Sequence, residues 1–94
     1  MEKKDEEKLL KLLGARGTKQ ILELLSEYGT IQYKQVEEFM SAPTLNKRLH
    51  ELLTFGLIKH RSKREKGREK GDKLTEKGKK IMKCMEAIIE VAEE

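Results

Sequence analysis

Two stretches carry most of the information on the fold: "PTLNKRLHELLTFGLIKHR", residues 43–61, and, after eleven further residues, "KLTEKGKKI", residues 73–81. At about 100° per residue, the leucines of the first stretch fall on one side of a helix. They are Leu45, Leu49, Leu52 and Leu53. Gly56 then stands where a helix typically stops. The spacing therefore predicts an amphipathic helix over 43–54 that leads into a strand.

The opposite side of this predicted helix is polar, and we interpret it as a surface that reads DNA bases. It holds Pro43, Thr44, Lys47, His50 and Glu51, with Asn46 and Arg48 on its two borders. Upstream, "KQVEEFM" at 34–40 predicts a two-turn helix, separated from the second helix by a tight "SAP" corner. Two helices in this arrangement are typical of a helix-turn-helix, in which the second helix enters a major groove.

The residues after Gly56 predict a β-hairpin. "LIKHRS" at 57–62 and "GDKLT" at 71–75 have the lengths of two strands, and the segment between them is rich in charge and glycine. Residues 59–73 carry 8 basic and 3 acidic side chains. A hairpin with this charge can follow the phosphates along a groove. We therefore interpret 59–73 as a basic wing.

A long C-terminal helix over 76–92 is predicted after Thr75, whose hydroxyl is suited to cap it. Its apolar side chains form one broad face, which we expect to join two copies of the chain, because symmetric dimers are the commonest oligomers. The residues expected at this interface are Ile81, Met85, Ile88, Ile89 and Ala92. The alternative is that this face packs on the N-terminal helix of the same chain.

Two further helices are expected upstream, over 5–14 and 18–29, each ending at a glycine. "TIQY" at 30–33 is expected to be a short edge strand or an extended link. The expected fold is mostly α with a small β-hairpin. Residues 1–94 would form one domain, in which 18–75 hold the helix-turn-helix and the wing and 76–92 the dimerisation helix.

The positive charge is concentrated in the middle of the chain. The net charge is +4, yet residues 44–80 alone carry 13 basic and 5 acidic side chains, whereas 1–43 carry 7 and 8 and 81–94 carry 1 and 4. A local excess of this size favours a polyanion as partner.

Several classes of function are not supported by the sequence. Motifs of phosphate loops, activated nucleophiles and paired catalytic groups are missing, so we expect neither an enzyme nor a cofactor. His50 and His60 have no ligand partners at zinc spacing, and a packing role is expected for Cys84, with redox sensing as the alternative. With one cysteine and no signal peptide or apolar run near 18 residues, a cytoplasmic protein is expected.

The two quoted stretches, with "ELLTFGLI" and "LTEKG" in this order, resemble the winged helix-turn-helix regulators of bacteria and archaea of the MarR, PadR and HxlR type. The resemblance covers roughly residues 18–89 and implies a DNA-binding transcriptional regulator. It implies that one set of side chains lies toward the major groove: Thr44, Asn46, Lys47, Arg48 and His50. It also implies wing contacts to the minor groove or the backbone from Arg64, Lys66, Arg68 and Lys70, to which we add Lys63 from the same basic run.

Two other functions stay open at this point. Winged helices also serve as protein–protein interaction modules, and small basic proteins also bind DNA without sequence preference as architectural proteins. A small-molecule effector is not expected, because the chain is shorter than the ligand-sensing regulators and lacks the extra helices that would enclose a large pocket.

Overall fold

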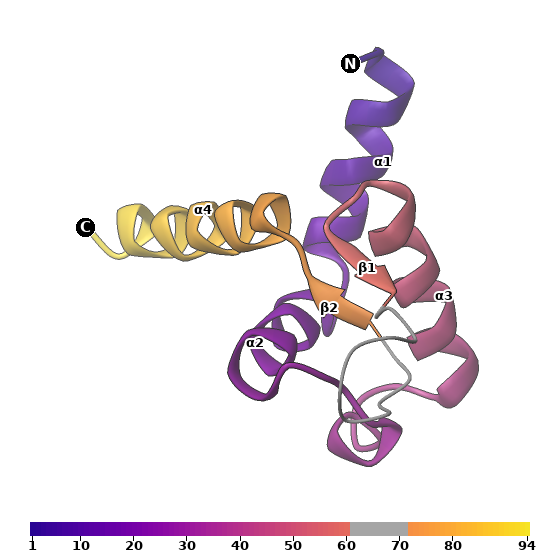
Figure 1. The fold of residues 1–94 in the computed structure, drawn as a ribbon. Coiled ribbons are helices and arrows are strands. Elements are labelled where there is room, and N and C mark those ends of the chain that lie inside the picture. The colour runs from indigo at the N-terminus through magenta and orange to yellow at the C-terminus, as the bar shows by residue number, and fades with distance from the viewer. Residues whose placement is uncertain (61–71) are drawn as a thin grey trace.

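The computed structural model describes residues 1–60 and 72–94. These residues form four α-helices, one short 3-10 helix and a two-stranded antiparallel sheet (Figure 1). In chain order the elements are α1 (Lys3–Gly14), α2 (Thr18–Tyr28), η1 (Tyr33–Gln35), α3 (Ala42–Thr54), β1 (Ile58–His60), β2 (Asp72–Leu74) and α4 (Glu76–Ala92). This is the mostly helical winged helix-turn-helix architecture predicted from the sequence.

The hairpin lies in the middle of the body and separates α2 from α3 (Figure 1). Strand β1 packs against α3, and β2 packs against α2 and α4. The buried core is aliphatic, and α1, α2, α3, β1 and β2 each contribute at least one buried apolar side chain to it. Its members are Leu12, Ile21, Leu22, Leu25, Val36, Met40, Leu45, Leu52, Leu57, Ile58 and Leu74.

The junction between α1 and α2 holds α1 in place. The hydroxyl of Thr18 is buried and donates a hydrogen bond of 2.7 Å to the carbonyl oxygen of Leu12. This bond satisfies one of the carbonyls that the end of a helix leaves without a partner inside the helix. Leu12 is itself buried, so the last turn of α1 is fixed against the core.

The prediction of a two-turn α-helix over 34–40 is wrong. The structure has the 3-10 helix Tyr33–Gln35 followed by a turn, and Gln32 before it is extended. The Gln35 side chain accepts a hydrogen bond of 2.8 Å from the backbone N–H of Gln32, which closes a tight turn. Val36 then leaves helical geometry, with φ −124° and ψ 0°, as its side chain becomes fully buried. Core packing and a local side-chain bond therefore override the helical pattern.

The start of α4 explains the "LTEKG" motif. The hydroxyl of Thr75 accepts a hydrogen bond of 3.0 Å from the N–H of Gly78 and donates one of 2.7 Å to the carbonyl oxygen of Gly56. Gly78 is buried, and a Cβ at this position would overlap the carbonyl oxygen of Leu57. Only glycine lets the first turn of α4 approach the start of β1 this closely.

Helices α1 and α4 both project from the body, in different directions, and the two chain termini lie at their far ends (Figure 1). The first half of α4 packs on the core through Ile81, Met82 and Met85. Its second half extends beyond the core, where Ile88, Ile89 and Val91 are exposed.

Candidate nucleic-acid interface

Helix α3 is held in one orientation by its cap and its leucine stripe. The backbone N–H of Thr44 donates a hydrogen bond of 3.2 Å to the hydroxyl oxygen of Ser41, which precedes the helix. Leu45 and Leu52 are buried, and Leu49 and Leu53 pack against the same core. Because the apolar side packs on the core, the opposite side of α3 faces outward.

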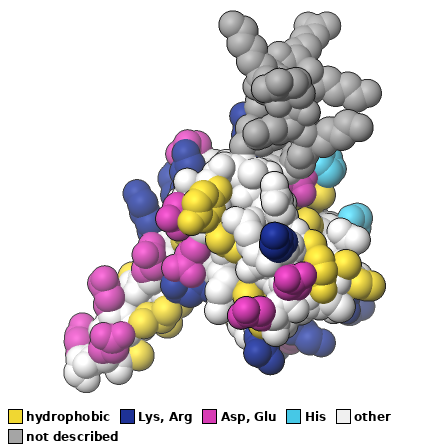
Figure 2. Space-filling model, turned by 90° about the horizontal axis from the view of Figure 1, so that it is seen from below, with side chains coloured by type: hydrophobic (Ala, Val, Ile, Leu, Met, Phe, Trp, Pro, Cys, Tyr) yellow, Lys and Arg dark blue, Asp and Glu magenta, His cyan; other side chains and the backbone are white. Residues whose placement is uncertain are grey.

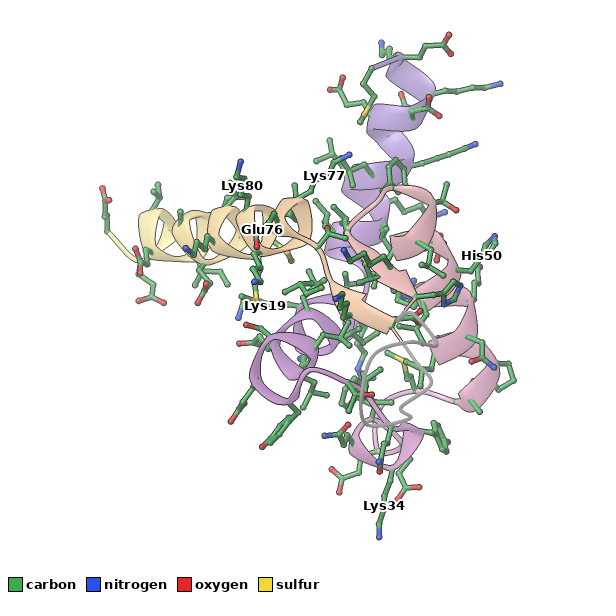
Figure 3. The ribbon with its side chains drawn as sticks, viewed as in Figure 1. Lys19, Lys34, His50, Glu76, Lys77 and Lys80 are labelled. Carbon is green, nitrogen blue, oxygen red and sulfur yellow. The ribbon has the colours of Figure 1, made fainter. Side chains whose placement is uncertain are left out.

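The outward side of α3 carries most of the side chains predicted to read bases. Pro43, Asn46, Lys47 and His50 are exposed, and Figure 3 shows His50 pointing away from the body. Thr44 is half-buried, and its hydroxyl accepts a hydrogen bond of 2.9 Å from Ser41. Asn46, Lys47 and His50 thus present donors and acceptors that base edges can pair with.

Arg48 lies elsewhere. Its side chain is only 16% exposed, and it lines a cavity together with residues of α1. Its Nη1 is 3.6 Å from Oε1 of Glu51, and its buried Nε has no hydrogen-bond partner among residues 1–60 and 72–94. The sequence grouped Arg48 with the base-reading side chains. The structure places it beside α1, apart from the exposed Asn46, Lys47 and His50.

The described part of the hairpin has a fixed register. Ile58 is opposite Leu74, Lys59 is opposite Lys73, and His60 is opposite Asp72. Five predicted wing contacts lie outside the described residues: Lys63, Arg64, Lys66, Arg68 and Lys70. The hairpin therefore defines where the basic segment leaves the body and where it returns.

A close histidine–carboxylate contact that the sequence analysis missed joins the two strands where they lead into the basic segment. Nδ1 of His60 lies 2.6 Å from Oδ1 of Asp72, whose side chain is 10% exposed. The signal for this pair is the strand register, because residues directly opposite each other on antiparallel strands are in contact. The contact between His60 and Asp72 therefore joins the two strands at the base of the wing.

The residues predicted for the dimer interface separate into two groups. Ile81 and Met85 are half-buried against the core of their own chain, whereas Ile88, Ile89 and Ala92 are exposed. Figure 2 shows acidic and hydrophobic side chains together on the arm that α4 forms. Ile88 is 67% exposed and Val91 is 64% exposed, so this end of α4 has an apolar surface without a partner in the described chain.

In residues 1–60 and 72–94, no group of three or more histidine, cysteine and acidic side chains could hold a metal ion. Among the described helices none is long and apolar enough to span a membrane. Cys84 is exposed and forms no disulfide.

Comparison with protein families gives one match. The family model for the HxlR-like helix-turn-helix matches residues 12–94, which include α2, α3, the hairpin and α4. Comparison with curated proteins and with solved structures gave no significant match.

Proposed function

Because the chain belongs to the HxlR-like helix-turn-helix family of DNA-binding transcription regulators, we propose that it binds double-stranded DNA sequence-specifically as a small homodimeric regulator. The observation that carries this proposal is the outward face of α3, a polar surface on a helix whose other side packs on the core. Such a helix can enter a major groove without changing its own packing.

Base reading is assigned to the exposed side chains of α3. Lys47 can pair with the O6 and N7 atoms of guanine, and Asn46 can pair with N6 and N7 of adenine. His50 and Thr44 complete the surface toward the groove. Each good pairing is worth about 1–3 kcal/mol of discrimination against the wrong base.

Phosphate contacts are assigned to the basic wing. Residues 59–73 carry a net charge of +5, since 8 side chains are basic and 3 are acidic. The contacting side chains proposed there are Lys63, Arg64, Lys66, Arg68 and Lys70, on the backbone or in the minor groove. Such contacts position the protein on DNA and carry no direct sequence information.

Dimerisation is assigned to α4. The supporting observation is the exposure of Ile88 and Ile89 on the half of α4 that extends beyond the core. Pairing two such ends would remove this apolar surface from water, with Ile81, Met85 and Ala92 at its edges. A dimer of this kind would place two copies of α3 about 34 Å apart, so half-sites should be centred roughly 10 base pairs apart or a multiple of this.

No catalytic step, metal or cofactor is part of the proposal, and a small-molecule effector is not part of it either. We place the protein in the cytoplasm, where a DNA-binding regulator of this size would act.

The decisive experiment is selection of bound duplexes from a random pool by the purified chain, followed by affinity measurements on the selected and random duplexes at several salt concentrations. We expect a palindromic motif, and selected duplexes bound roughly 10³-fold or more tightly than random ones. Equal affinity for both would indicate an architectural DNA-binding protein. Little binding of either at moderate salt would indicate a protein–protein interaction module.

The dimer is tested by sedimentation of the intact chain and of the double variant Ile88→Glu/Ile89→Glu. The intact chain should sediment as a dimer at micromolar concentration, whereas the variant should be a folded monomer, because both substituted side chains are exposed in the single chain. A monomeric intact chain would contradict the dimer and leave the DNA-binding test unaffected.

A further inference from the structure

A cavity of about 280 Å³ lies between α1 and α3, beside the outward face of α3. It is lined by side chains of both helices and of the residue after α1. They are Lys8, Lys11, Leu12, Ala15, Lys47, Arg48 and Glu51. The two helices are in contact, and the buried Leu12 and the Thr18 hydrogen bond hold the end of α1 in place. The walls of the cavity therefore come from two fixed helices.

Four of the lining side chains are cations and one is an anion. Lys8 and Lys11 are one turn apart on α1, and Lys47 and Arg48 are neighbours on α3. In the described part of the chain, neither Lys8, Lys11 nor Lys47 forms an ion pair. Lys11 is in the last turn of α1, where a cation is favoured by the helix dipole. The helix dipole therefore accounts for Lys11. The other three cations still outnumber the one anion among the lining residues, which favours an anionic ligand.

Arg48 supplies an independent observation. Within the described residues its buried Nε has no hydrogen-bond partner, although a buried donor without a partner is costly, and Oε1 of Glu51 is likewise buried and without one. Nη1 of Arg48 lies 3.6 Å from that oxygen, which is longer than a charge-assisted hydrogen bond. The guanidinium group presents several donors in one plane, in a geometry that matches the oxygens of a phosphate. An acceptor-rich anion in the cavity would satisfy the donor that Glu51 does not reach.

We propose that this cavity binds a phosphate group, held by Arg48 and by the ammonium groups of Lys8 and Lys11. Lys47 belongs both to the cavity and to the exposed face of α3, so the cavity opens next to the surface that would meet DNA. A backbone phosphate of the bound duplex is one source, and this version of the proposal rests on the function proposed above. A free phosphate or a phosphorylated solute offers the same chemistry.

The first experiment measures DNA affinity against salt concentration for the intact chain and for Lys8→Gln/Lys11→Gln. The matched control is Lys80→Gln/Lys83→Gln, which removes two exposed lysines with the same spacing from α4 (Figure 3 labels Lys80). If both lysines of α1 contact backbone phosphate, the slope of log affinity against log salt should flatten by roughly 2 per protomer. The control should keep the slope of the intact chain.

The second experiment measures the thermal midpoint in sodium phosphate and in sodium chloride of equal ionic strength, without DNA. Phosphate should raise the midpoint of the intact chain and of the α4 control more than chloride does, and this difference should disappear in Lys8→Gln/Lys11→Gln. Glu51→Gln should increase the difference, because it removes the one carboxylate that lines the cavity. A residue that only braced α3 would not change phosphate binding in that direction.

The two experiments separate the sources. A flattened slope assigns a DNA phosphate to the cavity, and a phosphate-specific rise of the midpoint with an unchanged slope assigns a free phosphate. If the intact chain binds no DNA, the proposed function fails and the thermal experiment alone decides on the cavity. The proposal is overturned if the α1 variant matches the α4 control in both measurements.

Discussion

Helices α3 and α4 are both amphipathic, but the rest of the chain covers their apolar sides to different extents. Both begin at a hydroxyl cap and carry an apolar stripe, but all four leucines of the α3 stripe are buried in the core or packed against it, whereas the stripe of α4 packs on the core only in its first half. The surface that the chain leaves uncovered therefore differs between the two helices. On α3 it is the polar side, and on α4 it includes the apolar side chains of Ile88 and Ile89. A polar surface on a fixed helix suits a nucleic acid, and an apolar surface suits another protein surface.

Two alanine substitutions test whether α3 is covered by its own chain and the end of α4 by a second copy. Leu52 of α3 is fully buried, so Leu52→Ala should lower the free energy of unfolding by about 2–5 kcal/mol. This cost should not depend on protein concentration. Ile88→Ala removes a side chain that is exposed in the single chain, so its cost should be small in dilute protein and should grow with protein concentration, as expected when dimerisation is linked to folding.

Urea unfolding of both variants at two protein concentrations, roughly a hundredfold apart so that a dimer is populated differently, provides the measurement. A cost of Ile88→Ala that is the same at both concentrations would mean that the end of α4 has no partner copy, and the contrast between the two helices would disappear.

The first turn of α4 gives the next largest expected effect. Gly78→Ala places a Cβ against the carbonyl oxygen of Leu57, where the backbone must shift, and should destabilise the fold by about 1–3 kcal/mol. Gly14→Ala is the matched control, since a Cβ there meets no atom within 4 Å. It should be neutral or slightly stabilising, because alanine is the better helix former. Equal thermal midpoints for the two variants would show that α4 can move away from β1 at little cost.

The sequence predicts those features of α3 and α4 that have local causes. The leucine spacing and the cap residues gave α3 within one residue of its observed bounds, and Thr75 with the apolar spacing gave α4 over 76–92 as observed. Periodicity identifies which side of a helix is apolar. It does not identify what covers that side, which is why Ile81 and Ile88 looked alike in the sequence and differ in the structure.

The parts that were missed depend on contacts between elements that are distant in the sequence. Arg48 lies at the border of the polar face in a helical projection, and only the position of α1 turns that border into the wall of a cavity. The pairing of His60 with Asp72 requires the strand register. The turn after Gln35 departs from a helix because Val36 is drawn into the core, a tertiary effect that overrides local helical preference.

The outward face of α3 is tested by comparing Asn46→Ala with Arg48→Ala in duplex selection. Asn46 is exposed, so its loss should relax the preferred base at one position of each half-site, at about 1–3 kcal/mol of discrimination. Arg48 faces α1, so its loss should weaken binding to selected and random duplexes by nearly equal factors. A changed motif for Arg48→Ala would return Arg48 to the base-reading face and remove it from the phosphate site.

The smallest expected effect concerns the caps that begin the two helices. Ser41→Ala removes the oxygen that accepts from the N–H of Thr44 at an exposed helix start, and a loss of about 0.5–1 kcal/mol is expected. Thr75→Ala removes an acceptor for Gly78 and also a donor to the carbonyl of Gly56, so its cost should be larger, about 1–2 kcal/mol. Thr75→Ser keeps both hydrogen bonds and should recover most of the difference in urea unfolding. If Ser41→Ala were the more costly substitution, the bond from Thr75 to Gly56 would contribute little, and the attachment of α4 to the body would depend on the close contact at Gly78 and on the core packing of Ile81, Met82 and Met85.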